Sequence, residues 1–439
     1  MELIFDKGTI RVEGLSLEKL RSLPLIQWDP RVRFHRAPPF RYPELVSDLH
    51  RKGLPFVDRI GGWKKIEDLN HPVELRPYQD AALAAWSAAN HRGMVVLPTG
   101  AGKTHVAMAA ISLLKSPSLN LVPTKVLLEQ WSQRLQAAFQ GPIGVIGDGR
   151  NEVCRVTVTT FESAYRHMSR IGHLFELLIV DEVHHFGNGF RDEALEMCAA
   201  PFRLGLTATP VEGEGAGRLV QWVGATVYKL GIAELSGNFL APFDHQVLNL
   251  TLSVEERYEY ELEMSKFRRF YRALAESKGT LDWKTFVRTA MRTQQGQLAV
   301  LSWRKAKRIA HFTKSKQATL SRLLDEHKDK KTLIFTGDSS VAYEISRKLL
   351  VMPITADIKT KERRDVLAKF SRGELRALVS CRVLNEGFDL PDAQIAVIVG
   401  GALGEREHVQ RMGRCLRPGI GKRAVIYELV SEETLEVGQ

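Results

Sequence analysis

Residues 97–104 read LPTGAGKT and have the residue types and spacing that polyphosphate binding requires. They follow the short apolar run at residues 94–96 and precede the helix-forming run HVAMAAISLL. A strand that ends in glycines and restarts as a helix leaves unpaired N–H groups and a positive helix dipole at one point. Lys103 would then reach the β- and γ-phosphates, and the Thr104 hydroxyl would bind Mg²⁺. Leu97 stands where the strict motif has its first glycine, and a plain strand-to-helix connection is the alternative interpretation.

Two adjacent carboxylates, Asp181 and Glu182, follow the apolar run LLIV. An apolar strand that ends in an aspartate can supply the carboxylate that binds Mg²⁺, and a second carboxylate beside it can activate the water that attacks the γ-phosphate. We therefore predict a metal ligand at Asp181 and a general base at Glu182. His184 and His185 form no H-E-x-x-H pair, which favours a polar contact near the nucleotide over a zinc site.

A third candidate set lies far downstream, in the segment QRMGRCLRP. Helical spacing would place Gln410, Arg414 and Arg417 on one face, because residues three and four apart are neighbours on a helix. Guanidinium groups can neutralise the charge that develops on a transferring γ-phosphoryl group, an effect of about 10³ to 10⁵ in rate in other nucleotide hydrolases. A row of surface arginines that only packs or pairs is the alternative.

Parallel α/β units are the elements that must position these residues. From about residue 72, short apolar runs alternate with longer helical patterns. Strands of the first unit are expected at residues 94–97, 119–122, 156–159, 177–180 and 204–207. The second unit is expected to have strands at residues 332–336, 352–355, 377–380 and 395–399, with helices at 341–350 and 359–370. LPTGAGKT, DEVHH and TATP then all follow strands, at the sheet edge where open parallel sheets bind ligands.

Two further segments combine basic and aromatic residues. Residues 1–70 are expected to form a small separate module with strands at 2–5 and 9–13, and residues 238–317 carry long charged helical stretches. In the N-terminal module such residues can contact phosphates and stack on bases, although a solvated basic face beside core aromatics would have the same composition. In the later segment they suit a helical arm that grips a nucleic-acid backbone, although a solvated helical hairpin would have the same composition. The residues concerned are Arg31, Arg33, His35, Arg36 and Arg41 near Trp28, Phe34, Phe40 and Tyr42, and Lys266, Arg268, Arg269, Arg272, Arg304, Lys305, Lys307 and Arg308 near Phe267, Phe270, Tyr271 and Trp303.

The composition of the 439-residue chain agrees with a polyanionic partner. Lys and Arg number 62 against 51 Asp and Glu, which gives a net charge of +11. The four cysteines form no C-x-x-C pair, which argues against a zinc site and a disulfide scaffold and favours an intracellular setting. No run of about 18 apolar residues occurs, and the amino terminus alternates like a strand, so we expect neither membrane attachment nor a signal peptide.

Taken in order, these motifs resemble those of superfamily 2 helicases and, more narrowly, the XPB family of DNA repair helicases. The resemblance covers residues 75 to 430 and rests on LRPYQ, LPTGAGKT, VPTKVLLEQW, VTTF, DEVHH, TATP, LIFTG, LNEGFDLPDA and QRMGRCLRP. It implies an α/β protein with two RecA-like parallel-sheet motor domains at residues 71–237 and 318–439. A small N-terminal α+β domain, similar to the family's damage-recognition domain, would span residues 1–70. Residues 238–317 would hold a linker and a helical, thumb-like arm, with the arm at about residues 251–312.

The resemblance also implies an ATP- and Mg²⁺-dependent DNA helicase or translocase that moves 3′ to 5′ and acts in DNA repair, in the cytoplasm, at the nucleoid or in a nucleus. Its partners would be single-stranded DNA and forked or damaged duplex, with a nuclease as a possible protein partner. Arg76 and Gln79 would recognise adenine, and Gly387 and Asp389 would couple the nucleotide to the second domain. Phosphates would be bound by Thr99, Gly100, Ala101, Gly102, Lys103 and Thr104, metal by Thr104 and Asp181, and Arg414 and Arg417 would be arginine fingers beside Gln410. Nucleic acid would touch the loops after Pro123, Thr160 and Ser380.

One segment departs from the family pattern. XPB proteins carry an Arg-Glu-Asp element shortly after the TAT motif, whereas residues 211–218 read VEGEGAGR. We therefore expect robust DNA-stimulated ATPase activity but weak strand displacement. Two alternatives stay open at this point: a motor directed to RNA, since such motifs mostly contact the backbone, and an ATP-switched DNA-binding scaffold that recruits a nuclease.

Overall fold

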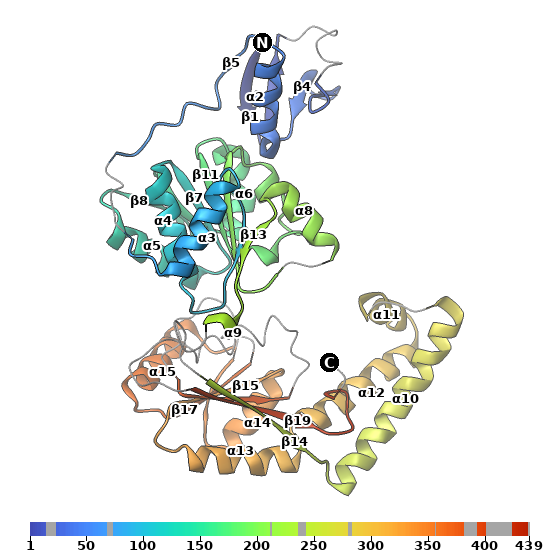
Figure 1. The fold of residues 1–439 in the computed structure, drawn as a ribbon. Helices are drawn as coiled ribbons and strands as arrows, with labels where there is room; N and C mark the ends of the chain where they lie inside the picture. The colour runs from blue at the N-terminus through green and yellow to red at the C-terminus, as the bar shows by residue number, and fades with distance from the viewer. Residues whose placement is uncertain are drawn as a thin grey trace. The chain divides into compact units, whose positions relative to one another are not determined.

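The computed structural model describes residues 1–14, 23–67, 73–210, 213–235, 243–279, 283–355, 357–381, 393–400 and 424–437. The chain divides into two compact units, of which the first holds Met1–Glu234 and the second holds the described residues from Leu235 onward (Figure 1). Five of the expected site residues lie outside the described part of the chain, and their roles stay predictions: Gly387, Asp389, Gln410, Arg414 and Arg417.

The first unit begins with a small mixed sheet covered by one helix. Strands β1 and β2 form an antiparallel hairpin around the turn at Lys7 and Gly8, both of which have positive φ. Leu45 and Leu49 of the covering helix are buried against the sheet. The elements are β1 (Glu2–Asp6), β2 (Thr9–Glu13), β3 (Gln27–Asp29), β4 (Phe34–Ala37), η1 (Pro39–Arg41), α2 (Tyr42–Arg51) and β5 (Val57–Asp58), and the strand order is β3-β4-β2-β1-β5.

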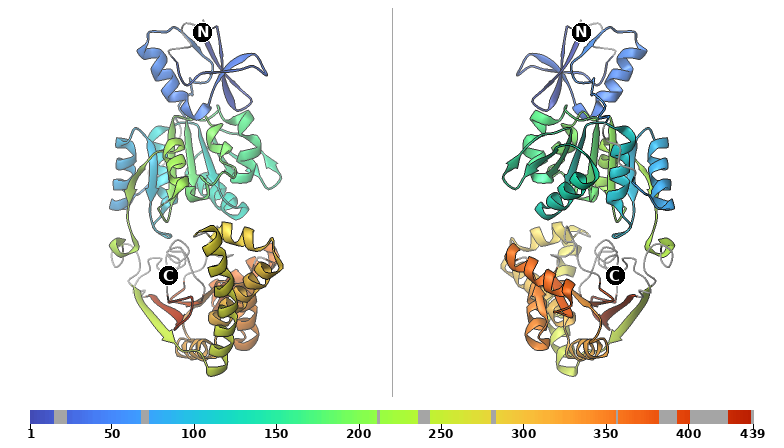
Figure 2. Two further views of the ribbon diagram at one scale, coloured as in Figure 1. Left: turned by 90° about the vertical axis from the view of Figure 1, so that its right-hand side faces the viewer. Right: turned by 90° about the vertical axis from the view of Figure 1, so that its left-hand side faces the viewer.

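An eight-stranded sheet follows, with helices on both faces (Figure 2). Its strand pairs are parallel except β8 with β9, and its central strands are fully buried, as apolar runs such as LLIV predict. The strands are β6 (Arg92–Val96), β7 (Ser118–Val122), β8 (Ile143–Gly147), β9 (Arg150–Asn151), β10 (Val156–Thr160), β11 (Leu177–Asp181), β12 (Phe202–Thr207) and β13 (Thr226–Lys229), in the order β13-β6-β12-β11-β7-β10-β8-β9. The helices are α3 (Pro77–Ala88), α4 (Lys103–Leu114), α5 (Lys125–Ala138), α6 (Phe161–Ile171), η2 (Val183–His185), α7 (Glu193–Glu196), α8 (Glu214–Trp222) and α9 (Ile232–Leu235).

The second unit contains a six-stranded parallel sheet. Residues 243–250, expected in the linker that precedes the helical arm, form an edge strand that pairs along its whole length with β19. Its strands are β14 (Phe243–Leu250), β15 (Thr332–Thr336), β16 (Met352–Ile354), β17 (Ala377–Cys381), β18 (Ile395–Val399) and β19 (Ala424–Ser431), in the order β14-β19-β18-β15-β17-β16. The helices around it are α13 (Lys314–Glu326), α14 (Ser339–Leu349) and α15 (Thr360–Arg372).

A helical arm is inserted between β14 and α13. It consists of α10 (Val254–Lys278), α11 (Trp283–Ala290) and α12 (Gln294–His311), and α10 and α12 lie side by side (Figure 1). The aromatic residues of the arm pack on one another, with Phe267 and Phe286 buried at its centre. Two parallel α/β sheets, a small N-terminal α+β module and a helical arm confirm the expected fold class. Within the described residues, no helix is both long enough and apolar enough to cross a bilayer.

Candidate functional site

The glycine loop after β6 has the backbone conformation that its sequence predicts. Gly100 and Gly102 have φ of +86° and +78°, and Gly102 is the N-cap of α4. A Cβ atom at Gly102 would lie only 2.4 Å from Gln79 Nε2. Glycine is therefore required at this position both for its left-handed conformation and for space.

The start of α3 holds this loop from the other side. Gln79 Nε2 and the Tyr78 hydroxyl each donate a 2.8 Å hydrogen bond to the Ala101 carbonyl. Gln79 Oε1 accepts a 2.8 Å hydrogen bond from the Arg76 backbone N–H, which completes a capping box. In this structure the Gln79 amide positions the phosphate loop, while adenine recognition by Arg76 and Gln79 stays a prediction.

Lys103 lies between the glycine loop and the two carboxylates at the end of β11. Strand β12 separates β11 from β6 in the sheet. Its side chain is buried, and Nζ donates to the Leu97 carbonyl at 3.3 Å. The same Nζ is 3.8 Å from Glu182 Oε1. One ammonium group can thus contact both the loop that would receive phosphate and the carboxylate predicted to activate water.

The carboxylate pair occupies the carboxyl end of β11. Asp181 accepts hydrogen bonds from Trp131 Nε1 at 3.1 Å and from the Glu182 backbone N–H at 3.0 Å. Burial, together with the neighbouring Glu182 charge, raises the pKa of Asp181 to about 6, although Lys103 acts in the opposite direction. Trp131 was not among the expected site residues. Its only signal in the sequence is a tryptophan at the end of VPTKVLLEQW.

Glu182 has a strained backbone and an unused oxygen. Its φ is +50°, which is uncommon for a residue other than glycine and is typical of functional sites. Its Oε2 atom is buried and accepts no hydrogen bond from the described part of the chain, and His184 Nδ1 lies 3.4 Å away. His184 Nδ1 also lies 2.9 Å from Thr207 Oγ1, so TATP contacts DEVHH through this histidine.

The oxygen atoms near the loop fit a magnesium-bound polyphosphate. The Thr104 hydroxyl accepts a 3.3 Å hydrogen bond from Arg134, and the buried Thr99 hydroxyl has no hydrogen-bond partner among the residues described. Mg²⁺ prefers hard oxygen ligands such as a threonine hydroxyl and an aspartate, and a glutamate oxygen that accepts no hydrogen bond within the described residues can bind a water of the metal. The structure thus brings together Arg76, Gln79, Thr99, Gly100, Ala101, Gly102, Lys103, Thr104, Asp181 and Glu182 at one edge of the sheet.

A polar pocket lies in the second unit, at the carboxyl ends of β15 and β17. Its volume is about 590 Å³. Three basic side chains of α12, Arg304, Lys307 and Arg308, line one side, and the N-terminus of α14 lines the other. Cys381, directly after Ser380, also lines it. A helix N-terminus that faces a cluster of basic groups suits an anionic ligand such as a backbone phosphate.

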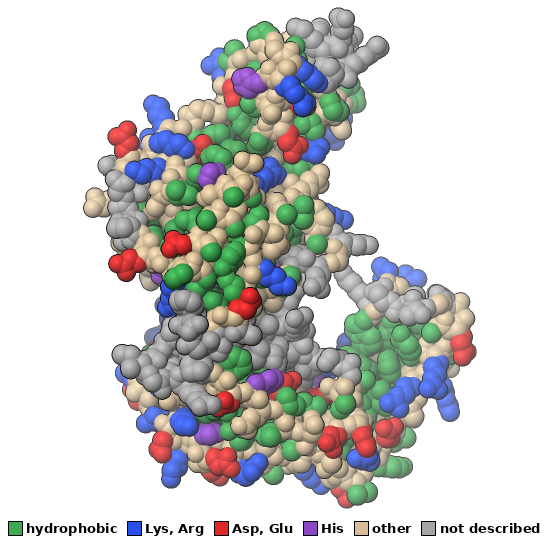
Figure 3. Space-filling view, in the orientation of Figure 1, with side chains coloured by type: hydrophobic (Ala, Val, Ile, Leu, Met, Phe, Trp, Pro, Cys, Tyr) green, Lys and Arg blue, Asp and Glu red, His purple; other side chains and the backbone are tan. Residues whose placement is uncertain are grey.

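The basic residues of the N-terminal module are largely used within the module. Arg31 pairs with Asp29, Arg36 with Asp6 and Arg41 with Glu44. Trp28 is exposed, but its ring packs beside His35. On the molecular face drawn in Figure 3, Lys and Arg side chains are interspersed with Asp and Glu. The charge pairs favour the interpretation of a solvated basic surface for this module.

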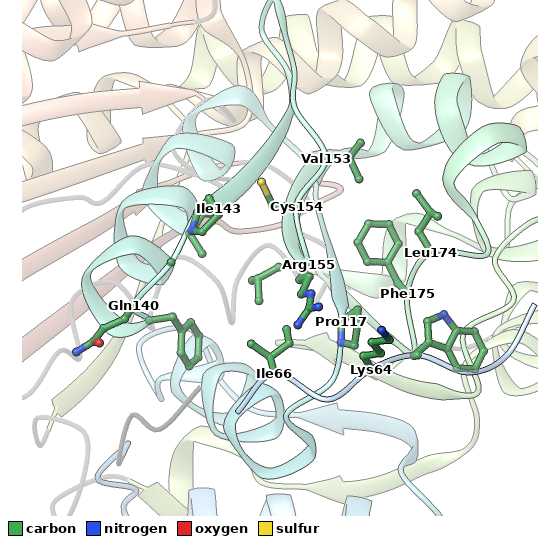
Figure 4. A pocket seen from close by; sticks show the side chains of 15 residues that line it. Lys64, Ile66, Pro117, Gln140, Ile143, Val153, Cys154, Arg155, Leu174 and Phe175 are labelled. Atoms are coloured by element: carbon green, nitrogen blue, oxygen red, sulfur yellow. The ribbon is translucent and has the colours of Figure 1, made fainter. Parts of the chain in front are cut away.

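A second large pocket lies at the opposite edge of the first sheet. It is about 690 Å³ in volume and is lined mainly by apolar residues at the amino ends of β7, β8 and β10, such as Pro117, Ile143 and Val156 (Figure 4). Phe175 and Leu174 close its other side. Since nucleotide ligands bind at the carboxyl ends of parallel strands, we assign this pocket no part in the chemistry.

The glycine loop, the Asp181–Glu182 pair and the two parallel sheets define a helicase-type nucleotide-hydrolysing motor. Three family models match the chain: "Xeroderma pigmentosum group B helicase damage recognition domain" over residues 3–60, "Type III restriction enzyme, res subunit" over residues 72–212, and "Helicase conserved C-terminal domain" over residues 315–419. The chain is 34% identical to the DNA 3′-5′ translocase XPB2 of Sulfurisphaera tokodaii over 94% of each chain. This chain belongs to the XPB family of helicases.

Two other comparisons agree with this assignment. The chain is 29% identical to the DNA 3′-5′ helicase XPB of Mycobacterium tuberculosis, over 93% of this chain and 70% of that protein. The crystal structure of the Pyrococcus furiosus Hef helicase domain is similar with a TM-score of 0.53 and 18% identity, covering 82% of this chain and 96% of that chain. The structural likeness shows a shared fold.

Proposed function

We propose that this protein is a DNA-dependent ATPase that moves along DNA in the 3′ to 5′ direction and acts in DNA repair. The observation that carries the proposal is the position of Lys103, whose Nζ contacts the phosphate loop and lies 3.8 Å from Glu182 Oε1. The printed names of the relatives, DNA 3′-5′ translocase and DNA 3′-5′ helicase, support both the substrate and the polarity.

Each described residue of the nucleotide site has a definite role in this proposal. Lys103 and the loop N–H groups bind the β- and γ-phosphates, and Thr104 and Asp181 would hold Mg²⁺. The metal, when bound, neutralises phosphate charge. Glu182 orients the attacking water and accepts its proton, for which its buried Oε2 atom, which accepts no hydrogen bond from the described residues, is suited. The arginine fingers expected at Arg414 and Arg417 remain a prediction.

The pocket between α12 and α14 is the proposed contact with the DNA backbone in the second unit. Arg304, Lys307 and Arg308 supply positive charge, and the N-terminus of α14, where Asp338 caps the Ser340 N–H, supplies the positive end of the helix dipole. Backbone contacts of this kind bind nucleic acid with little regard to sequence. A nuclease partner, considered from the sequence, has no support among the contacts described and stays a prediction.

Two substitutions test the hydrolytic roles. Lys103→Ala removes the phosphate-binding ammonium, and Glu182→Gln removes the base, so each should lower DNA-stimulated ATP turnover by about 100-fold or more. Turnover is measured as phosphate release with and without single-stranded DNA, and circular dichroism verifies folding.

Lys64→Ala and Glu152→Gln are matched controls, because both side chains are exposed in the same unit and have no role in the site. Turnover near the wild-type rate in either site variant would remove the role assigned to that residue. Matched DNA and RNA oligonucleotides are compared in the same assay, and stronger stimulation by RNA would favour the RNA-directed alternative.

A further inference from the structure

The loop that follows DEVHH presents an aromatic ring to solvent on a rigid support. Phe190 is 67% exposed, although it lies only eight residues after Glu182. Asp192 is buried, and its two carboxylate oxygens accept hydrogen bonds from the Gly187 N–H at 2.8 Å and the Gly189 N–H at 2.7 Å. Gly187, Gly189 and Arg191 all have positive φ. One buried carboxylate therefore holds a tightly turned loop with the ring at its tip.

The ring has a cation on one side. Arg191 Cζ lies 4.3 Å from the centroid of Phe190, within cation–π range. Arg191 Nε is itself 2.9 Å from Glu162 Oε2. The ring is therefore held against a guanidinium group that α6 anchors, while two thirds of the side chain stays open to solvent.

The surroundings connect this ring to the expected nucleic-acid contacts. Glu162 lies in the first turn of α6, two residues after Thr160, at the VTTF loop that the family resemblance places on nucleic acid. The same carboxylate pairs with Arg166 at 2.8 Å. Tyr165 is 44% exposed and is a neighbour of Glu162 on the helix surface. Glu193 and Glu196 of α7 add negative charge next to the loop, so stacking and not net charge must supply most of the attraction.

One glycine of residues 211–218, Gly215, packs directly on the loop that carries Phe190. A Cβ atom at Gly215 of α8 would lie 3.0 Å from the Gly187 carbonyl oxygen, and one at Gly187 would lie 2.7 Å from the Gly215 carbonyl oxygen. Arg218, also on α8, is 4.0 Å from Asp192. Close backbone packing thus joins α8 to the loop that carries Phe190.

We propose that Phe190 stacks on an unpaired base of bound DNA at the junction between duplex and single strand. This inference rests on the proposed DNA-directed function. A single exposed aromatic residue is ordinary on a protein surface. Phe190 differs because Asp192 fixes its loop, Arg191 orients its ring, and the Arg191–Glu162 ion pair ties it to the first turn of α6. Strand separation by this chain then depends on an aromatic ring whose loop packs against α8.

The test is an abasic scan of a forked DNA, in which one base near the junction is removed at a time. Stacking on an aromatic side chain contributes enough that its loss weakens binding by about tenfold. For the wild-type protein, we expect one abasic position to weaken binding by about that factor. Phe190→Ala should bind the intact fork as weakly as the wild-type protein binds the fork with that abasic position. Removal of the same base should not weaken the binding of Phe190→Ala further, whereas Phe190→Tyr should restore the wild-type pattern.

Leu113→Ala is the control, because Leu113 is a similarly exposed apolar side chain of the same unit, at 52%. It should reproduce the wild-type scan. A flat scan of the wild-type protein, or a loss in Phe190→Ala that adds to the loss at every abasic position, would overturn the stacking proposal. If DNA stimulates ATP turnover while the scan is flat, only this inference fails; if no DNA stimulates turnover, the proposed function fails.

Discussion

At the residue scale, Gly102 shows how a single side chain controls the nucleotide site. The position requires a positive φ, and the space that a Cβ atom would take is filled by Gln79 Nε2. Gln79 is in turn hydrogen-bonded to the Ala101 carbonyl. The loop conformation therefore depends on the absence of a side chain at one residue and on the presence of a long amide at another.

Gly102→Ala should weaken ATP binding by at least about tenfold, because the new methyl group displaces Gln79 and the loop must leave its left-handed conformation. Binding is measured with a fluorescent ATP analogue. Gly53→Ala is a control that also has a positive φ but meets nothing within 4 Å, so it should cost a little stability and leave ATP binding unchanged. Wild-type affinity in Gly102→Ala would contradict the role given to the loop conformation.

At the scale of elements, the helical arm is joined to the second sheet by a buried polar cluster. Lys316 Nζ of α13 lies 2.6 Å from Glu436 Oε2 and donates to the Ala310 carbonyl at 3.0 Å. Ser431 Oγ, at the end of β19, donates to the same carbonyl at 2.7 Å. His311, the last residue of α12, is buried beside this cluster. The end of the arm, the start of α13 and the residues after β19 are thus held together by charge-assisted hydrogen bonds.

His311 makes this joint sensitive to acid. Burial lowers the pKa of His311 to about 4, although the Glu436 carboxylate acts in the opposite direction. The charged groups around it are Lys307 on α12, Lys316 on α13, Asp338 before α14 and Glu436 after β19. Between pH 6.5 and 4 the unfolded chain binds a proton at this histidine and the folded chain does not, so stability falls as the pH falls through that range.

The second unit should therefore lose up to about 3 kcal/mol of unfolding free energy from His311 alone between pH 6.5 and pH 4. Urea unfolding of the wild-type protein and of His311→Gln at several pH values gives, for each protein, the slope of the unfolding free energy against pH. His311→Gln should flatten the dependence in this range, and substitution of the exposed His50 should not. Equal slopes for the wild-type protein and His311→Gln would show that His311 does not carry the effect.

At the scale of the whole molecule, the basic residues that give the net charge of +11 differ in their surroundings. In the N-terminal module, Arg31, Arg36 and Arg41 pair with carboxylates. By contrast, basic side chains of α12 line a pocket beside a helix N-terminus. The charge surplus of a chain therefore indicates its class of partner, but the pairing of each group decides which surface contacts that partner.

DNA binding should weaken steeply with salt, and the slope should depend on the α12 pocket. A double substitution, Arg304→Gln with Arg308→Gln, should lower the slope of log affinity against log salt by about 2 between about 50 and 200 mM, since each lost phosphate contact lowers it by about 1. Fluorescence anisotropy with single-stranded DNA measures the slope. Arg322→Gln, on the exposed surface of α13 and paired with Glu326, is the control and should leave it unchanged. An unchanged slope in the double variant would place the phosphate contacts elsewhere.

Much of the motor architecture could be predicted from local patterns. The fully buried strands β11 and β15 have apolar runs that any α/β interpretation would find, and Lys103, Asp181 and Glu182 follow strands as expected. Strand β14 could not be predicted in the same way, because its exposed and partly buried residues do not alternate regularly. It is a strand because it pairs with β19, near the other end of the chain. The aromatic residues of the arm, which stand beside its basic residues in the sequence, prove to form its core, where Phe267 is buried.

By itself, the sequence determined the glycine loop, the strand-terminal carboxylates and the order of the motifs. These depend on backbone preferences and apolar periodicity, which act over a few neighbouring residues. Only the tertiary structure decided that Trp131 holds Asp181, that Gln79 holds the loop, and that Gly187 packs on Gly215. Trp131 and Asp181 are 50 residues apart. Such contacts arise when separate elements pack against one another, and no local pattern specifies which distant group will meet which.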